Sequence, residues 1–278
     1  MFKRLNALFI IPILICISIN SSYAKTIRIA ALYWSMNIEG QVAMRKGIEE
    51  KFKSINNNKK YSLTPYVAGD GKEGISKQVQ QMYSAIKQKV DLIIIQPTDH
   101  KALIAPLKLA NKKNIPVIAY DSYISEGEIS SYITSNNYQA GYLNGEYINS
   151  LYDDDYKIKV VIVDYPKVSS TIQRVNGFHD ALKSNSQKYK IIGTYKAVDP
   201  SSGKQAGIDI LKSHPDKNSI DVIFTINDGG GLSIVNAMAS AKRSEIKFAT
   251  VDGDPQSVNN IKSSRLTVVN SAQFCSEL

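Results

Sequence analysis

The chain has 278 residues, a formal net charge of +9 at pH 7 and 43% apolar residues. This length exceeds what one hydrophobic core usually organises, so we expect two lobes. The lysines are scattered along the chain and form no stripe with interleaved aromatic residues, which argues against a nucleic-acid partner.

The first 24 residues have the three-part plan of a secretory signal peptide. Lys3 and Arg4 precede an apolar stretch over residues 8–19, and small residues then lead to Ala24. A membrane anchor is the alternative, but about a dozen apolar residues fall short of the roughly 20 that a spanning helix needs. Lipid attachment at Cys16 is disfavoured by the bulky residue before it. We therefore expect export to the periplasm, with cleavage after Ala24.

Cleavage at that position leaves Cys275 as the only cysteine of the mature chain. An intrachain disulfide is then impossible, so the exported protein has to be held together by an ordinary apolar core. No second long apolar segment follows the first.

Strand-like and helix-like segments alternate through the first half of the mature chain. Several of the strands are continuous apolar runs, which is typical of parallel strands covered by helices on both faces. Repeated strand-helix-strand units predict a doubly wound parallel sheet with right-handed crossovers. The expected strands are 26–32, 61–67, 90–96 and 115–120, and the expected helices are 41–55, 72–87 and 101–112.

The same alternation restarts after a strand over residues 129–134. We expect an N-terminal lobe over 25–135 and a C-terminal lobe over 136–273, with loops at 38–40, 121–127 and 228–231. The second array has expected strands 157–164, 188–196, 220–226, 246–251 and 266–270, and expected helices 138–151, 169–183, 204–213, 230–241 and 256–263.

Enzyme and metal motifs are scarce. The three histidines lie in unrelated segments without metal-ligand spacing, and no nucleophile motif is present. The glycine run 228–231 lacks the Walker lysine and the G-x-G-x-x-G spacing, so a tight turn is favoured over a phosphate site. Asp254 precedes Pro255 and is expected to be a helix N-cap, since a calcium loop would need more ligands. We expect no enzyme activity, no cofactor and no metal site.

Polar side chains follow several of the apolar strands. Because ligands of open parallel sheets bind at the carboxyl ends of the strands, these side chains have a reason to be there beyond solubility. Arginine, carboxylates and carboxamides hydrogen-bond hydroxyl groups in the plane, and tryptophan offers an apolar face. Taken singly, each residue could equally belong to a capped turn or a solvated loop. The candidate ligand-binding residues are Trp34, Asn37, Asp121, Arg174, Asn227, Asp252 and Gln273.

Several segments in this order resemble a known family, the periplasmic sugar-binding proteins of the ribose/galactose type. These are the substrate receptors of ABC importers. The resemblance covers essentially the whole mature chain and implies two Rossmann-like lobes that close on a ligand about a hinge. It places five of the candidates, all except Trp34 and Asn37, at ligand-contacting positions. The segments are 90–97, Ile115-Pro-Val-Ile-Ala-Tyr-Asp121, 132–141, Arg174-Val-Asn-Gly-Phe178, 222–228, Val251-Asp-Gly-Asp-Pro255 and 272–273.

Two departures from the ribose-binding pattern argue against ribose itself. Ser122 stands where that pattern has an arginine, and the segment Tyr33-Trp34-Ser-Met-Asn37 replaces its aromatic sandwich. Losing a cation while keeping Asp121, Asp228 and Asp252 nearby makes the expected cleft more acidic, which would tolerate a ligand that carries an amine.

The family continues after the residue matching Gln273 with a helix that returns to the first lobe, whereas residues 274–278 here would only start that segment. We therefore expect a C-terminally truncated version of the fold. Its first lobe should have an exposed apolar face, marginal stability and weakened closure.

These features together predict a monomeric, exported receptor for a small sugar-like ligand. Its partner would be an ABC permease in the inner membrane. The alternative is a periplasmic sensor, similar to autoinducer-2 receptors, that acts with a histidine kinase or chemoreceptor. Genomic neighbours would discriminate the two.

Overall fold

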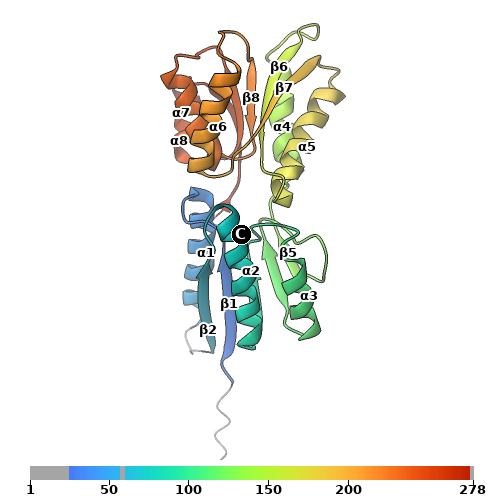
Figure 1. Cartoon of the computed structure of the whole chain (residues 1–278), viewed down its shortest axis with the longest axis vertical. Helices are drawn as coiled ribbons and strands as arrows, with labels where there is room; N and C mark the ends of the chain where they lie inside the picture. Colours follow the sequence, from blue (N-terminus) through green and yellow to red (C-terminus); the bar gives the residue numbers. More distant parts are fainter. Residues whose placement is uncertain (1–24, 57–59, 276–278) are drawn as a thin grey trace, which may run out of the picture.

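Two parallel β-sheets lie one above the other along the long axis of the molecule, and each forms the centre of one lobe (Figure 1). The computed structural model describes residues 25–56 and 60–275, so the expected signal peptide lies outside the described residues. Within those ranges, no helix is both long and apolar enough to cross a membrane.

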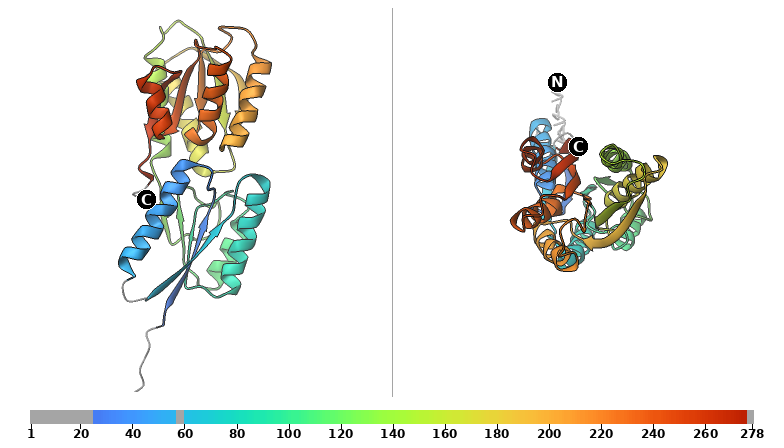
Figure 2. Two further views of the ribbon diagram at one scale, coloured as in Figure 1. Left: turned by 90° about the vertical axis from the view of Figure 1, so that its left-hand side faces the viewer. Right: turned by 90° about the horizontal axis from the view of Figure 1, so that it is seen from above.

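The N-terminal lobe is built on a five-stranded parallel sheet with the order β2-β1-β3-β4-β5. Buried residues of α2 and α3 pack on one face of this sheet, and α1 covers part of the other (Figure 2). The strands are β1 (Ile27–Tyr33), β2 (Tyr61–Val67), β3 (Leu92–Ile95), β4 (Val117–Tyr120) and β5 (Ser131–Ile133). The helices are α1 (Glu39–Ile55), α2 (Gly71–Lys87) and α3 (Ile104–Lys112).

The two faces of this sheet are covered unequally. Ile93 and Ile95 point toward α2 and α3 and are fully buried. On the opposite face, Ile94 of β3 and Ile118 of β4 are only half-buried. Ile133 of β5 is 44% exposed. The α1 side of the sheet is therefore only partly covered at β3, β4 and β5.

The C-terminal lobe repeats the arrangement with the strand order β10-β9-β8-β6-β7, again all parallel. Buried residues of α4 and α5 form the core on one face, and those of α6 and α7 form it on the other. The strands are β6 (Ile158–Asp164), β7 (Tyr189–Lys196), β8 (Val222–Thr225), β9 (Lys247–Asp252) and β10 (Thr267–Ala272). The helices are α4 (Asn137–Asn149), α5 (Ser169–Ser184), α6 (Pro200–Ser213), α7 (Asp228–Ser240) and α8 (Pro255–Lys262).

The predicted doubly wound α/β fold with two lobes is confirmed. In each sheet the strand order reverses beside the first strand of the lobe, at β1/β3 and at β6/β8. A ligand crevice is expected at the carboxyl ends of strands at such a switch point. The carboxyl ends of β4, β8 and β9 carry the polar residues that the sequence singled out.

Several helix starts differ from the sequence expectation, among them that of α3, which begins at Ile104 instead of residue 101. Helix α6 begins at Pro200, four residues early, because Asp199 and Ser202 form a capping box there. Helices α1 and α7 begin at Glu39 and Asp228, so the expected loops 38–40 and 228–231 are largely helical. The glycines at the start of α7 allow close packing, since a Cβ on Gly230 would lie 3.0 Å from the backbone nitrogen of Val198.

The backbones of α4 and α5 touch through two glycines. A Cβ on Gly141 would overlap the carbonyl oxygen of Arg174, and one on Gly177 would overlap that of Tyr138. This contact sets how far α5 stands from α4 and therefore where Arg174 is held.

We expect Gly141→Ala to destabilise the protein by about 2–3 kcal/mol, because the two helices would have to separate. Urea unfolding followed by circular dichroism measures this change. Leu143→Ala is the matched control, since Leu143 lies on the same helix and is 48% exposed. The control should stay within about 0.5 kcal/mol of the wild type. Equal unfolding midpoints for Gly141→Ala and the wild type would contradict the close-packing argument.

Candidate functional site

A narrow cavity lies between the two lobes and is lined by residues of both. The space between its atoms totals about 380 Å³, but only about 30 Å³ is wide enough for the centre of a water molecule. The lobes thus leave room for little more than a water molecule between them. The lining residues are Trp34, Ile38, Gly40, Gln41, Met44, Asp121, Val168, Ser170, Thr171, Arg174, Val198, Asn227, Asp252, Gln273 and Cys275.

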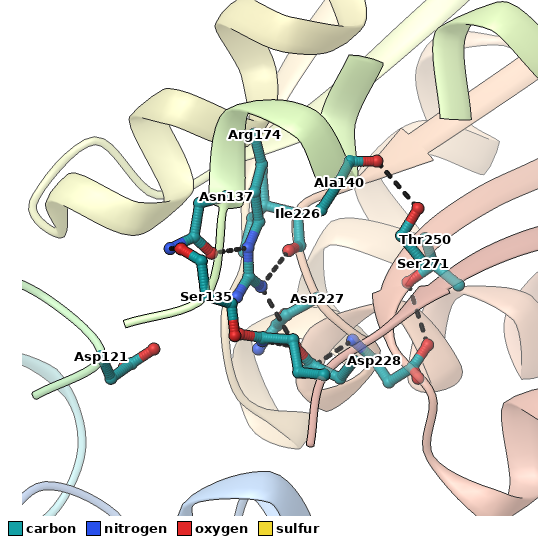
Figure 3. Close-up of polar contacts among 12 residues, drawn as sticks. Asp121, Ser135, Asn137, Ala140, Arg174, Ile226, Asn227, Asp228, Thr250 and Ser271 are labelled. Atoms are coloured by element: carbon teal, nitrogen blue, oxygen red, sulfur yellow. Dashed lines mark hydrogen bonds and ion pairs between the residues drawn. The ribbon is translucent and has the colours of Figure 1, made fainter. Parts of the chain in front are cut away.

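Arg174 on α5 is the centre of a buried hydrogen-bond network in the C-terminal lobe (Figure 3). It is 3% exposed. Its Nε donates to Asn137 Oδ1 at 2.9 Å, and its Nη1 donates to the carbonyl oxygen of Ile226 at 2.7 Å and to Asp252 Oδ1 at 3.1 Å. Arg174 therefore connects α5 with the start of α4 and with the carboxyl ends of β8 and β9.

Asp252 ends β9 and is shared between several donors. Besides Arg174, it accepts from Gln273 Nε2 at 2.7 Å. Burial raises the pKa of Asp252, and Arg174 opposes this rise. Close behind it, Asp228 accepts from the backbone N–H of Asp254, and burial together with the charge of Asp252 raises its pKa to about 6. The carboxyl group of Asp228 thus lies behind that of Asp252, on the side away from the cleft.

Asp254 occupies the N-cap position of α8 with Pro255 after it, as the sequence predicts. The hydrogen bond that an N-cap side chain is expected to make is absent. Burial raises its pKa to about 8, and the nearby charges of Asp252, Asp228 and Glu39 add to the rise. The Asp254 carboxyl group therefore stays protonated at pH values well above those at which an ordinary aspartate loses its proton.

Asp121 enters the cavity from the N-terminal lobe, across from the Arg174 network (Figure 3). It is 7% exposed, and its Oδ2 accepts from Gln96 Nε2 at 3.1 Å. Burial raises its pKa, while Arg174 and the Gln96 hydrogen bond lower it. Gln96 follows β3, so it repeats the polar strand ending of Asp121, and the sequence analysis missed it.

Both cleft aspartates have backbones in the positive-φ region. Asp121 has φ 63° and Asp252 has φ 121°, where non-glycine residues are uncommon. Surrounding contacts hold these conformations: Thr134 Oγ1 and the backbone N–H of Gln273 donate to the carbonyl oxygens of Asp121 and Asp252, respectively. Such strain persists where the structure over-determines it, and it is concentrated at binding and catalytic sites.

The remaining candidates are placed differently from one another. Trp34 lines the cavity and stacks on Tyr165 of the other lobe, with ring centroids 6.0 Å apart. Asn227 also lines it, but its Nδ2 donates to the carbonyl oxygen of Val198 and its Oδ1 accepts from Gly230. Asn37 is not part of the lining, and its side chain donates to Asp70 instead.

The structure thus brings six of the seven candidates to one cavity and leaves Asn37 outside it. Their contact with a ligand stays a prediction. The lining also contains residues that sequence reasoning did not select, among them Gln41, Ser170, Thr171 and Cys275. Ser170 and Thr171 follow β6 in the first turn of α5, which is a usable signal. Cys275 has no such signal, because it reaches the cavity only through packing against the N-terminal lobe.

The family of the chain follows from its sequence. Residues 29–273 match the periplasmic binding protein domain. The chain belongs to this family. The ribose import binding protein of Bacillus subtilis (strain 168) is 26% identical over 255 residues, covering 91% of this chain and 79% of that protein. The galactofuranose-binding protein of Escherichia coli (strain K12) is 26% identical over 193 residues, covering 67% and 60%.

Solved structures share the fold. An ABC transporter solute-binding protein from Burkholderia multivorans superimposes with a TM-score of 0.80 at 20% identity, covering 91% of this chain and 89% of that one. The Caulobacter myo-inositol binding protein has a TM-score of 0.76 at 24% identity, covering 87% and 80%.

Arg174→Ala should destabilise the protein by about 3–5 kcal/mol, because it leaves the buried Asp252 carboxylate without its cation. Chemical unfolding at pH 7 measures the loss. Arg174→Lys keeps the charge but loses the guanidinium fork, so it should fall between Arg174→Ala and the wild type. Wild-type stability of Arg174→Ala would mean that the network contributes little to the fold.

The raised pKa of Asp254 makes stability depend on pH. Asp254 keeps its proton in the folded state over a pH range in which it releases that proton in the unfolded state. The free energy of unfolding that Asp254 contributes therefore falls as the pH rises from about 4 to about 8. Asp254→Asn should therefore raise the melting temperature more at pH 8.5 than at pH 5, by about 3 °C or more. The exposed Asp154→Asn should show no such difference. A pH-independent effect of Asp254→Asn would rule out the linkage.

Proposed function

We propose that the chain is an exported solute receptor that binds a sugar or a similar small polar solute between its lobes and presents it to an ABC permease. The observation that carries this proposal is the single cavity whose polar lining comes from both lobes. A ligand that contacts Asp121 of one lobe and Arg174, Asp252 and Gln273 of the other bridges the two. Binding then favours the closed arrangement through its differential affinity for that state.

The lining has the chemistry that a polyhydroxylated ligand requires. Carboxylates and carboxamides at strand ends accept and donate in-plane hydrogen bonds to hydroxyl groups, and Trp34 supplies a flat apolar wall for C–H groups. The one thiol in the lining, Cys275, has its pKa raised to about 12 by burial, which makes it a poor nucleophile. Among the described residues, no cluster of three or more histidine, cysteine or acidic side chains could hold a metal ion.

Relatives with this fold bind solutes of the same kind. The names of the Bacillus subtilis and Escherichia coli relatives specify ribose import and galactofuranose binding. A periplasmic solute-binding protein from Actinobacillus succinogenes has D-allose bound and shares the fold with a TM-score of 0.73. These properties support sugar binding and periplasmic import for this chain.

Closure of the lobes is stabilised by direct contacts around the cavity rim. Ser122 Oγ of the N-terminal lobe accepts from the backbone N–H of Ser169, a donor in the first turn of α5. Helix N-termini leave such donors without intrahelical partners, so the N-terminal lobe in effect caps α5 when the cleft is shut. Lys167 bridges to Asp99 at 3.1 Å on the same rim. These few polar contacts leave room for a ligand to shift the balance.

Trp34 is the only tryptophan of the chain, so its fluorescence should report binding. We expect a saturable fluorescence change with one or more members of a panel of pentoses, hexoses, polyols and amino sugars. The same compound should raise the melting temperature, since a ligand at 100 times its Kd stabilises by about 2.7 kcal/mol. Trp34→Phe should abolish the optical signal while the thermal shift persists. If no panel member changes either readout, the proposed function is wrong.

A further inference from the structure

The cavity has an unbalanced set of charges. Asp121 and Asp252 are in its lining, and Asp228 and Asp254 lie directly behind Asp252. Within the part of the chain that the structure describes, Arg174 is the only cationic side chain in the lining. The cleft wall is therefore rich in carboxyl groups and poor in cations.

The one cation is already committed. Arg174 forms its ion pair with Asp252 at 3.1 Å, and both side chains are almost completely buried. Its other hydrogen bonds go to Asn137 and to the carbonyl oxygen of Ile226. Among the described residues, no ion pair reaches Asp121, and the one hydrogen bond to its carboxyl group comes from the neutral amide of Gln96. Asp121 thus faces the cavity without a direct ion pair, and the charge of Arg174 acts on it only through space.

A second acceptor in the lining has no partner. The Oε1 atom of Gln273 is buried and accepts no hydrogen bond within the described ranges, while its Nε2 donates to Asp252. A buried acceptor without a donor costs free energy, so a ligand that supplies the donor gains by it. Asp121 and Gln273 belong to opposite sides of one cavity, and both require hydrogen-bond donors.

An ammonium group matches these requirements better than a hydroxyl group. It offers three donors and no acceptor, whereas a hydroxyl offers one donor and brings lone pairs that the cleft cannot use well. Its charge is also favoured beside the carboxyl group of Asp121, which lines the cavity and forms no direct ion pair within the described part of the chain. Trp34 in the same lining can contact the cation through its ring face.

We propose that the ligand carries a protonated amine, as amino sugars and amino polyols do, and that Asp121 and Gln273 bind this ammonium group. The inference rests on the proposed function and narrows its ligand class. Glutamine and aspartate together accept several N–H bonds, so both lobes would contact the charged end of the ligand.

Matched pairs of probes test the proposal by isothermal titration calorimetry at about pH 6.5, where these amines are protonated. The pairs are D-glucosamine with D-glucose, D-galactosamine with D-galactose, and 1-amino-1-deoxy-D-sorbitol with D-sorbitol. In at least one pair, the amine should bind about tenfold or more tightly than its neutral partner. N-acetylation of the amino sugar should remove that advantage.

The outcomes separate the two proposals. Neutral members that bind as tightly as their amine partners would overturn the amine inference and leave solute binding intact. If no member of any pair binds, both proposals fail for these solutes, and the wider panel followed by Trp34 fluorescence then decides the proposed function alone. Tighter binding of an amine supports both.

Two substitutions test the residues. Asp121→Asn should reduce the preference for the amine to within about twofold while affecting the neutral partner less, because only the charge is removed. Gln273→Met removes the unpaired acceptor without placing a second carboxylate against Asp252, so it should also reduce the preference, and the assignment stays testable if Asp121→Asn does not fold. The exposed Asp154→Asn is the control and should leave the ratio unchanged. Folded variants at both positions that keep the wild-type ratio would overturn the assignment.

Discussion

The buried ion pair between Arg174 and Asp252 is the interaction on which the cleft depends. It joins α5 to the end of β9, and the hydrogen bond from Arg174 to the carbonyl oxygen of Ile226 adds the end of β8. Burying two charges is unfavourable unless their geometry and remaining hydrogen bonds are nearly complete. Here Asn137 accepts a hydrogen bond from Arg174, and Gln273 donates one to Asp252. These bonds fix the wall of the C-terminal lobe without a ligand.

A fixed wall in one lobe gives the other lobe a defined surface to close on. Trp34, which stacks on Tyr165, and Ile38 pack with buried apolar residues of the C-terminal lobe. The polar contacts between the lobes are individually small, among them hydrogen bonds at Ser122, His100 and Tyr123 and one half-exposed ion pair at Lys167. Each contributes on the order of 1 kcal/mol. A population shift between open and closed states by a small solute requires a balance of this size.

The sequence predicts the parts of this site that depend on local order. Apolar runs that end in Asp121 and Asp252 place those residues correctly, because the carboxyl ends of parallel strands meet at one edge. Contacts between distant segments are not predictable in this way. Sequence reasoning treated Arg174 as a ligand-binding group, whereas the structure shows that most of its donors serve the protein. Sequence reasoning also predicted that the Asp254 side chain caps α8. In the structure this side chain makes no capping hydrogen bond and is instead buried among other carboxyl groups.

The positive φ angles of Asp121 and Asp252 restrict what can replace these residues, independently of any ligand. Asparagine and glycine tolerate the left-handed region in which Asp121 lies, while the φ of Asp252 lies beyond it, where glycine is the residue that fits with least strain. Two separate demands, one from the backbone and one from the cleft, therefore act on the same positions. The two positions differ in what an exchange for asparagine would do. At Asp252 it would leave Arg174 without its buried partner, whereas at Asp121 it removes a charge that forms no direct ion pair with any described residue and keeps a residue that the backbone there accepts.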